Sequence, residues 1–168
     1  MASGIFLGRF QPFHNGHMEM VAKAQAEVDE LIIVIGSAEK SFVEDNPFTA
    51  GERMTMILET IAMSDWDNII VVPIRDLGRY GLWVHHLEDM LPKFSTVFSS
   101  DGPTIALFQE KGYRVKTFDM KNRQVLSGTA IREMMASGNP TWEEHVPLGT
   151  KKVINEIEGV DRVKHMRR

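Results

Sequence analysis

The sequence predicts an α/β fold in which a doubly wound parallel sheet of Rossmann-like type carries helices on both faces. Five short apolar runs alternate with segments of helical periodicity, and these runs occupy residues 5–7, 31–35, 69–74, 96–98 and 113–118. Their near-continuous apolar character is typical of parallel strands buried on both faces. Strands joined by helices of this length form right-handed βαβ units, so we expect three layers, with a five-stranded sheet in the middle.

The first two connections carry clear helix signals. Residues 18–30 follow the first apolar run and are predicted as a helix. After the second run, Thr49 and Glu52 form a capping box at the start of the next helix. This helix has an apolar stripe that we expect to face the core, formed by Met54, Ile57, Leu58 and Ile61.

The later connections are also predicted to be helical. Amphipathic spacing indicates a helix over residues 82–90, and Pro103 fits the first position of another helix, which Gly112 ends. Ser127 is the predicted N-cap of a helix that stops at Gly138. The basic residues 162–168 are interpreted as a solvated helix end, or alternatively as a source of positive potential beside a neighbouring subunit.

Composition limits the class of protein. The 168 residues, 43% of them hydrophobic, suit one soluble globular domain over residues 1–168 that ends in a helical segment. A net charge of −4 argues against a general nucleic-acid binder. No apolar segment approaches the roughly 18 to 20 residues of a membrane span. The absence of cysteine excludes disulfides and thiolate catalysis and is compatible with a reducing cytoplasm, so we expect a cytoplasmic protein with neither nucleic-acid nor membrane partners.

The most informative segment is GRFQPFHNGH at residues 8–17, which lies between the first strand and the first helix. A helix start offers unpaired backbone N–H groups and the positive end of the helix dipole. His14 and His17 are three residues apart there, close enough to converge on one anion, so the segment predicts a phosphate site. Three neighbours complete it: Arg9 as a phosphate-binding cation, and Gly8 and Gly16 for turning and close backbone approach.

A second anion site is predicted at SGTAIR, residues 127–132. Ser127 and Thr129 offer hydroxyl groups at a helix start, and Arg132 lies one turn into the helix, where its guanidinium can bridge two phosphate oxygens. The alternative is a simple helix cap with a solvated arginine. Beside the histidine segment, the phosphate interpretation is favoured.

Together these segments resemble the HxGH nucleotidyltransferase superfamily, and within it the archaeal type of nicotinamide-nucleotide adenylyltransferase. The resemblance extends from about residue 5 to about residue 164 and includes five blocks in the family's order: GRFQPFHNGH, GSA at 36–38, NPFTAGER at 46–53, LWV at 82–84, and SGTAIR. It implies transfer of AMP from ATP to nicotinamide mononucleotide, with NAD and pyrophosphate as products. Archaeal members are commonly homo-oligomers, often hexamers, so a homo-oligomer is expected here.

The resemblance also implies how the residues act. SGTAIR corresponds to the family segment that holds the β- and γ-phosphates of ATP. A mononucleotide already carries an anionic phosphate nucleophile, so catalysis is mostly alignment and charge neutralisation. His14, His17, Arg9 and Arg132 are therefore expected to hold the triphosphate and to stabilise the leaving pyrophosphate. Mg²⁺ would bridge phosphate oxygens, and because such an ion uses mostly phosphate and water ligands, no protein residue is predicted as a metal ligand.

Two residues are predicted on the acceptor side. The family tryptophan in LWV stacks on the nicotinamide ring, which assigns that role to Trp83; a core aromatic is the alternative. Asp76 follows the third strand, in a region that the family uses for the nicotinamide nucleotide. Two stretches depart from the family pattern: Glu39 and Phe42 replace common Gln and His residues, and SSDGP at 99–103 replaces Ser-Gly-Asn-Pro. These departures concern acceptor identity more than reaction type.

Two other functions stay open from the sequence. One is an adenylyl- or cytidylyltransferase with another acceptor, flavin mononucleotide or phosphopantetheine, against which the Trp83 block and SGTAIR both count. The other is a catalytically silent module that senses NAD or ATP. The retained histidines and the Ser/Thr/Arg segment count against a silent module.

Overall fold

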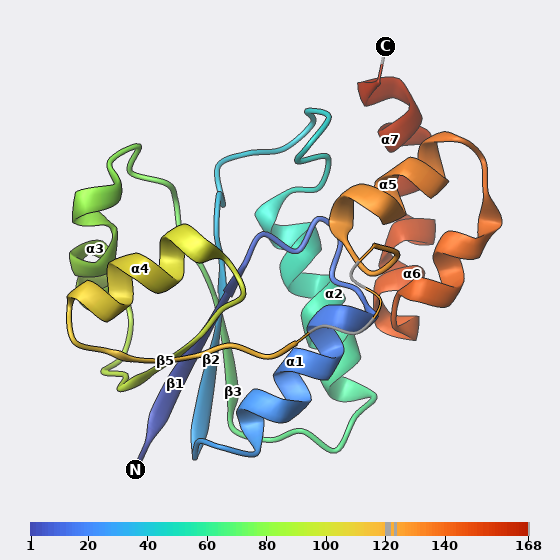
Figure 1. Ribbon diagram of the computed structural model, residues 1–168. Helices are drawn as coiled ribbons and strands as arrows, with labels where there is room; N and C mark the ends of the chain where they lie inside the picture. Colours follow the sequence, from blue (N-terminus) through green and yellow to red (C-terminus); the bar gives the residue numbers. More distant parts are fainter. Residues whose placement is uncertain (120–121, 123, 168) are drawn as a thin grey trace.

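The computed structural model describes residues 1–119, 122 and 124–167, and in this part of the chain five parallel strands form one sheet (Figure 1). The strands are β1 (Ser3–Gly8), β2 (Glu30–Ile35), β3 (Ile69–Pro73), β4 (Thr96–Phe98) and β5 (Arg114–Lys116). Their order is β3-β2-β1-β4-β5, with every neighbouring pair parallel. The predicted doubly wound sheet is confirmed, and the direction of strand addition reverses at β1, where such sheets bind ligands.

Helices cover both faces of the sheet, as predicted (Figure 1). One face carries α1 (Asn15–Gln25) and α2 (Ala50–Ala62); the other carries α3 (Trp83–Met90), preceded by the 3₁₀ turn η1 (Tyr80–Leu82), and α4 (Gly102–Glu110). Alternate side chains of β2 pack into two different hydrophobic cores, one on each face of the sheet. Ile33 packs into the cluster that includes α1 and α2, and Ile32 packs into the cluster that includes α3 and α4.

The remaining elements form a helical segment beyond α2: α5 (Gly128–Ala136), η2 (Pro140–His145), α6 (Leu148–Glu156) and α7 (Gly159–Met166). Helix α6 packs so closely on α2 that a Cβ atom at Gly149 would lie 2.6 Å from the backbone nitrogen of Thr60. None of the helices in the described residues is long and apolar enough to cross a membrane.

The end of the chain differs from its predicted solvated state. Arg162 of α7 pairs with Glu52 at 2.6 Å, and only 14% of its side chain is exposed. Arg167 pairs with Glu133 of α5 at 2.6 Å. The solvated interpretation is therefore wrong for these two arginines, because carboxylates on α2 and α5 bind them; Arg168 lies outside the described residues.

Two helix predictions also need correction. Helix α1 ends at Gln25, not at residue 30, because Glu30 already pairs with Ser3 in the sheet. In α2 the predicted capping box is present, but the buried residues are Arg53, Met56, Ile57 and Thr60, and Leu58 is 48% exposed. Ile57 is buried and Met54 and Ile61 pack against the core, so the predicted stripe is confirmed except at Leu58.

Candidate functional site

The loop between β1 and α1 brings His14 and His17 together. His14 is the N-cap of α1, and its Nδ1 accepts the backbone N–H groups of Gly16 at 3.1 Å and His17 at 3.3 Å. In return, the Nδ1 of His17 accepts the backbone N–H of His14 at 3.2 Å. The two rings stack, with centroids 3.6 Å apart and an interplanar angle of 22°. Because both Nδ1 atoms are acceptors, each neutral ring carries its proton on Nε2.

Burial keeps both rings neutral. It lowers the pKa of His14 from its ordinary value of 6.5 to about 4. The pKa of His17 is also held well below its ordinary range, first by burial and then by repulsion from His14. At neutral pH the pair therefore presents two Nε2–H donors. Such N–H groups can donate hydrogen bonds to phosphate oxygens although the rings carry no positive charge.

The start of α5 docks on the histidine loop. The Oγ of Ser127 accepts the backbone N–H of Ala130 at 3.1 Å, which confirms the predicted N-cap. Arg132 is buried and donates from Nη1 to the carbonyl of Gln11 at 2.8 Å and from Nη2 to the Oγ1 of Thr129 at 3.4 Å. The alternative of a solvated arginine is therefore wrong.

Gly128 permits this close docking. A Cβ atom at that position would lie 2.9 Å from the Nη1 of Arg132 and 3.1 Å from the carbonyl oxygen of Gln11. Burial lowers the pKa of Arg132, as does the neighbouring charge of Arg9. The two predicted anion segments, separated by more than a hundred residues in the sequence, are thus parts of one positively charged arrangement.

A buried arginine, Arg53, binds the loops next to the two predicted anion segments. Arg53 is fully buried, and all five of its N–H donors reach backbone carbonyls. The acceptors are the carbonyls of Arg9, Gly36, Ser37, Lys40 and Thr49, at 2.9 to 3.3 Å. Burial lowers the pKa of Arg53 to about 10, still far above neutrality. Arg53 therefore fixes the exits of β1 and β2 to the start of α2; sequence reasoning gave it no role.

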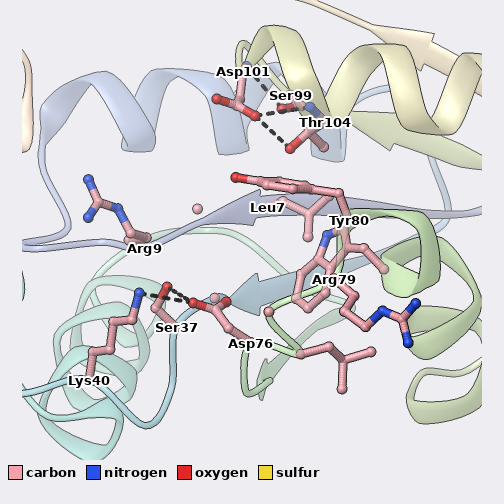
Figure 2. Close-up of a pocket in the computed structure, with 15 residues that line it drawn as sticks. Leu7, Arg9, Ser37, Lys40, Asp76, Arg79, Tyr80, Ser99, Asp101 and Thr104 are labelled. Carbon is pink, nitrogen blue, oxygen red and sulfur yellow. Dashed lines mark hydrogen bonds and ion pairs between the residues drawn. The ribbon is translucent and has the colours of Figure 1, made fainter.

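A cavity of about 540 Å³ opens at the carboxyl ends of the strands (Figure 2). Four of the predicted site residues line it: Gly8, Arg9, Asp76 and Trp83. In Figure 2 the hydroxyl of Tyr80 is directed toward the side of the cavity where Arg9 lies. Gly8 also contacts the chain itself, since a Cβ atom there would lie 2.8 Å from the ring of Phe10.

Asp76 lies on the β2 side of the cavity. Its Oδ2 accepts the hydroxyl of Ser37 at 2.7 Å and pairs with the Nζ of Lys40 at 3.3 Å (Figure 2). Burial alone would raise the pKa of Asp76, but hydrogen bonds from Ser37 and Lys40 outweigh this effect and lower it. Glu39, a departure from the family pattern, accepts the backbone N–H of Asp76 at 3.1 Å. It therefore supports the conformation of this loop.

Trp83 meets both descriptions that the sequence left open. It lines the cavity, and it also packs against the core cluster of the α3 and α4 face.

Another wall of the cavity comes from a segment to which the sequence assigned no site residues. Its residues are Ser99, Asp101 and Thr104. Asp101 caps α4 by accepting the backbone N–H of Thr104 at 3.0 Å and its hydroxyl at 2.7 Å (Figure 2). The second departing stretch thus forms a wall of the cavity.

The two aspartates of the cavity already have partners within the chain. Asp76 already accepts from Ser37 and Lys40, and Asp101 accepts twice from Thr104. Within the described ranges, no group of three or more His, Asp or Glu side chains could hold a metal ion. We assign no metal ligand to this chain.

Comparison with known proteins gives concordant findings. The sequence pattern of the cytidylyltransferase-like family matches residues 5–134. The chain is 45% identical over 160 residues to the nicotinamide-nucleotide adenylyltransferase of Methanococcus maripaludis, with 95% of this chain and 92% of that protein covered. It is 44% identical to the protein of the same name from Thermoplasma acidophilum, with 95% and 89% covered.

A solved structure shares the fold. The bifunctional NMN adenylyltransferase/ADP ribose pyrophosphatase of Francisella tularensis, complexed with AMP and a manganese ion, superposes with a TM-score of 0.75 at 18% identity. The alignment covers 98% of this chain, which spans about half, 52%, of that protein. At this identity the likeness concerns the fold alone.

Proposed function

The chain belongs to the cytidylyltransferase-like family and, within it, to the nicotinamide-nucleotide adenylyltransferases, and we propose from this how residues at the carboxyl ends of its strands position ATP and nicotinamide mononucleotide for transfer of AMP. One observation carries the proposal. Buried Arg132 binds the carbonyl of Gln11, three residues before the stacked His14–His17 pair. The same loop begins at Gly8 and Arg9, which line the cavity.

In this proposal the triphosphate lies along the positive arrangement. The Nε2–H groups of His14 and His17 donate to phosphate oxygens around the α-phosphorus. Arg132, with the hydroxyls of Ser127 and Thr129, holds the β- and γ-phosphates. Arg9 adds charge at the cavity mouth, and Gly8 and Gly16 let the phosphates approach the backbone at the start of α1.

The acceptor occupies the cavity. Trp83 stacks on the pyridine ring of nicotinamide mononucleotide, and Asp76 accepts a hydrogen bond from its polar groups. An oxygen of the acceptor 5′-phosphate attacks the α-phosphorus of ATP. The new bond joins the two phosphates in NAD, the bond to the β-phosphate oxygen breaks, and pyrophosphate leaves with the electron pair. The chain's residues align the two phosphates and stabilise the charge that develops on pyrophosphate.

Four further properties accompany this proposal. Mg²⁺ bound to ATP would supply charge neutralisation on the phosphates, and no residue of this chain is assigned to hold it. The whole chain, residues 1–168, acts as one nucleotidyltransferase domain. The working form is a homo-oligomer, as in the resembling archaeal proteins, and the enzyme acts in the cytoplasm.

The decisive experiment is an acceptor panel. The purified protein is given ATP and Mg²⁺ with nicotinamide mononucleotide, nicotinate mononucleotide, flavin mononucleotide or phosphopantetheine, and both pyrophosphate and the adenylylated product are identified. We expect pyrophosphate release with NAD as the product. Release only with flavin mononucleotide or phosphopantetheine would overturn the acceptor assignment. ATP binding without release for any acceptor would overturn the catalytic assignment in favour of a nucleotide sensor.

A further inference from the structure

The loop between β2 and α2 reaches both arginines of the proposed triphosphate site. The Oδ1 of Asp45 lies 3.8 Å from the Nη2 of Arg132. The next residue, Asn46, accepts a hydrogen bond on its Oδ1 from the Nη1 of Arg9 at 3.5 Å. Two consecutive side chains of one loop therefore contact the side chains that the proposed function assigns to phosphate.

Helix α7 holds this loop in place from the outside (Figure 1). The guanidinium of Arg162 lies 4.2 Å from the centroid of the Phe42 ring and donates to the carbonyl of Pro47 at 3.3 Å. Glu44 lies 3.7 Å from the Nε of Arg167. Arg162 thus contacts the loop on both sides of Asp45, at Phe42 and at Pro47, which keeps Asp45 beside Arg132.

The carboxylate of Asp45 is placed so that another anion could replace it beside Arg132. The Arg132 side chain is only 5% exposed, whereas that of Asp45 is 78% exposed. Their 3.8 Å separation is an ion pair but exceeds hydrogen-bonding distance. A phosphate group offers Arg132 shorter, charge-assisted and bidentate bonds. A carboxylate and a phosphate also repel each other, so both anions cannot bind the same guanidinium favourably.

We propose that Asp45 is the built-in counter-ion of Arg132, and that ATP displaces its carboxylate on binding, so that Asp45 lowers the affinity of the site for triphosphates. This inference rests on the proposed function, because that function makes Arg132 the ligand of the β- and γ-phosphates. Asp45 then determines how tightly the substrate is held and how readily pyrophosphate leaves.

The test compares Asp45→Asn with Glu44→Gln as a matched control, since Glu44 pairs with Arg167 rather than with Arg132. We expect the KM for ATP of Asp45→Asn to fall about two- to fivefold, the range for an ion pair with one exposed partner. The KM for nicotinamide mononucleotide should stay unchanged. The difference in the KM for ATP should narrow at high salt, because screening weakens exposed charges. Glu44→Gln should change the KM for ATP less than Asp45→Asn does, because the charge of Glu44 affects Arg132 less than that of Asp45.

Calorimetry with tripolyphosphate separates this inference from the proposed function. It measures anion binding without turnover, so it reports on Asp45 even if the acceptor panel fails. We expect tripolyphosphate to bind Asp45→Asn about two- to fivefold more tightly than the parent. Weaker binding, or an equal gain in Glu44→Gln, would overturn the role of Asp45, because the loop would then assist the anion or act only through general charge.

Discussion

Replacing the imidazole of His14 should change how the free energy of unfolding depends on pH. The size of this change follows from the burial of the ring. In the unfolded chain the imidazole has its ordinary pKa of 6.5, whereas burial lowers the folded value to about 4. Between these pH values the unfolded chain binds a proton at His14 that the folded protein does not. Lowering the pH through this window therefore favours unfolding. The contribution is about 3 kcal/mol over the whole window, at roughly 1.4 kcal/mol per pH unit.

The matched variant is His14→Asn. Asparagine is among the best N-cap residues, and its side-chain oxygen can accept the N–H groups of Gly16 and His17 that the imidazole now accepts. The variant therefore retains the helix cap and removes the titrating ring. Urea unfolding at fixed protein concentration, followed by tryptophan fluorescence, gives the free energy of unfolding at each pH.

We expect the parent to lose about 3 kcal/mol more than His14→Asn between pH 6.5 and 4. Above pH 6.5 the two stability curves should run parallel, since His14 is then neutral in both states. Parallel curves throughout the window would refute the reasoning, because the imidazole would then titrate alike in the folded and unfolded chains. A steeper curve for the variant would refute it as well.

Three further outcomes are expected. His17→Ala or Arg132→Ala should lose about 2 to 4 kcal/mol of transition-state stabilisation, measured as kcat/KM for ATP, and unchanged turnover in both would contradict the phosphate assignment. Arg53→Met should lower the free energy of urea unfolding by about 3 to 5 kcal/mol, because it strands five carbonyls, and Arg53→Lys should lose less. Trp83→Ala should raise the KM for nicotinamide mononucleotide at least about tenfold and that for ATP little, whereas Trp83→Phe should retain most of the stacking; a shared rise in both KM values would indicate a packing role.

The sheet was predictable because burial on both faces leaves a signal in the strands themselves. Residues 31–35 read as an unbroken apolar run, and in the structure Ile32 and Ile33 face opposite cores. The helix starts within the two predicted anion segments were predictable for a related reason. Residues at helix starts, such as Ser127, act through local backbone geometry that a short stretch of sequence determines.

The cavity wall at Asp101 and the buried position of Arg53 on α2 were missed because their contacts are long-range. Arg53 was given no role from the sequence, because its five acceptors are backbone carbonyls, which every residue possesses and which leave no trace in sequence. The tertiary structure alone identifies which carbonyls converge. Arg162 was misread in the same way, because its partner, Glu52, is far away in the chain.

Arg53, Arg162 and Arg132 therefore differ in role, and their hydrogen-bond partners show the difference. Arg53 uses all five donors on carbonyls and has none left for a ligand. Arg162 binds a carboxylate of its own chain, at Glu52, and stabilises α7 against α2. Arg132 is buried and makes one short bond to a backbone carbonyl, a weak contact to a hydroxyl and a long ion pair with the exposed Asp45. A buried guanidinium with donors to spare is costly unless an anion completes its bonding, which is why Arg132 is the arginine assigned to the triphosphate.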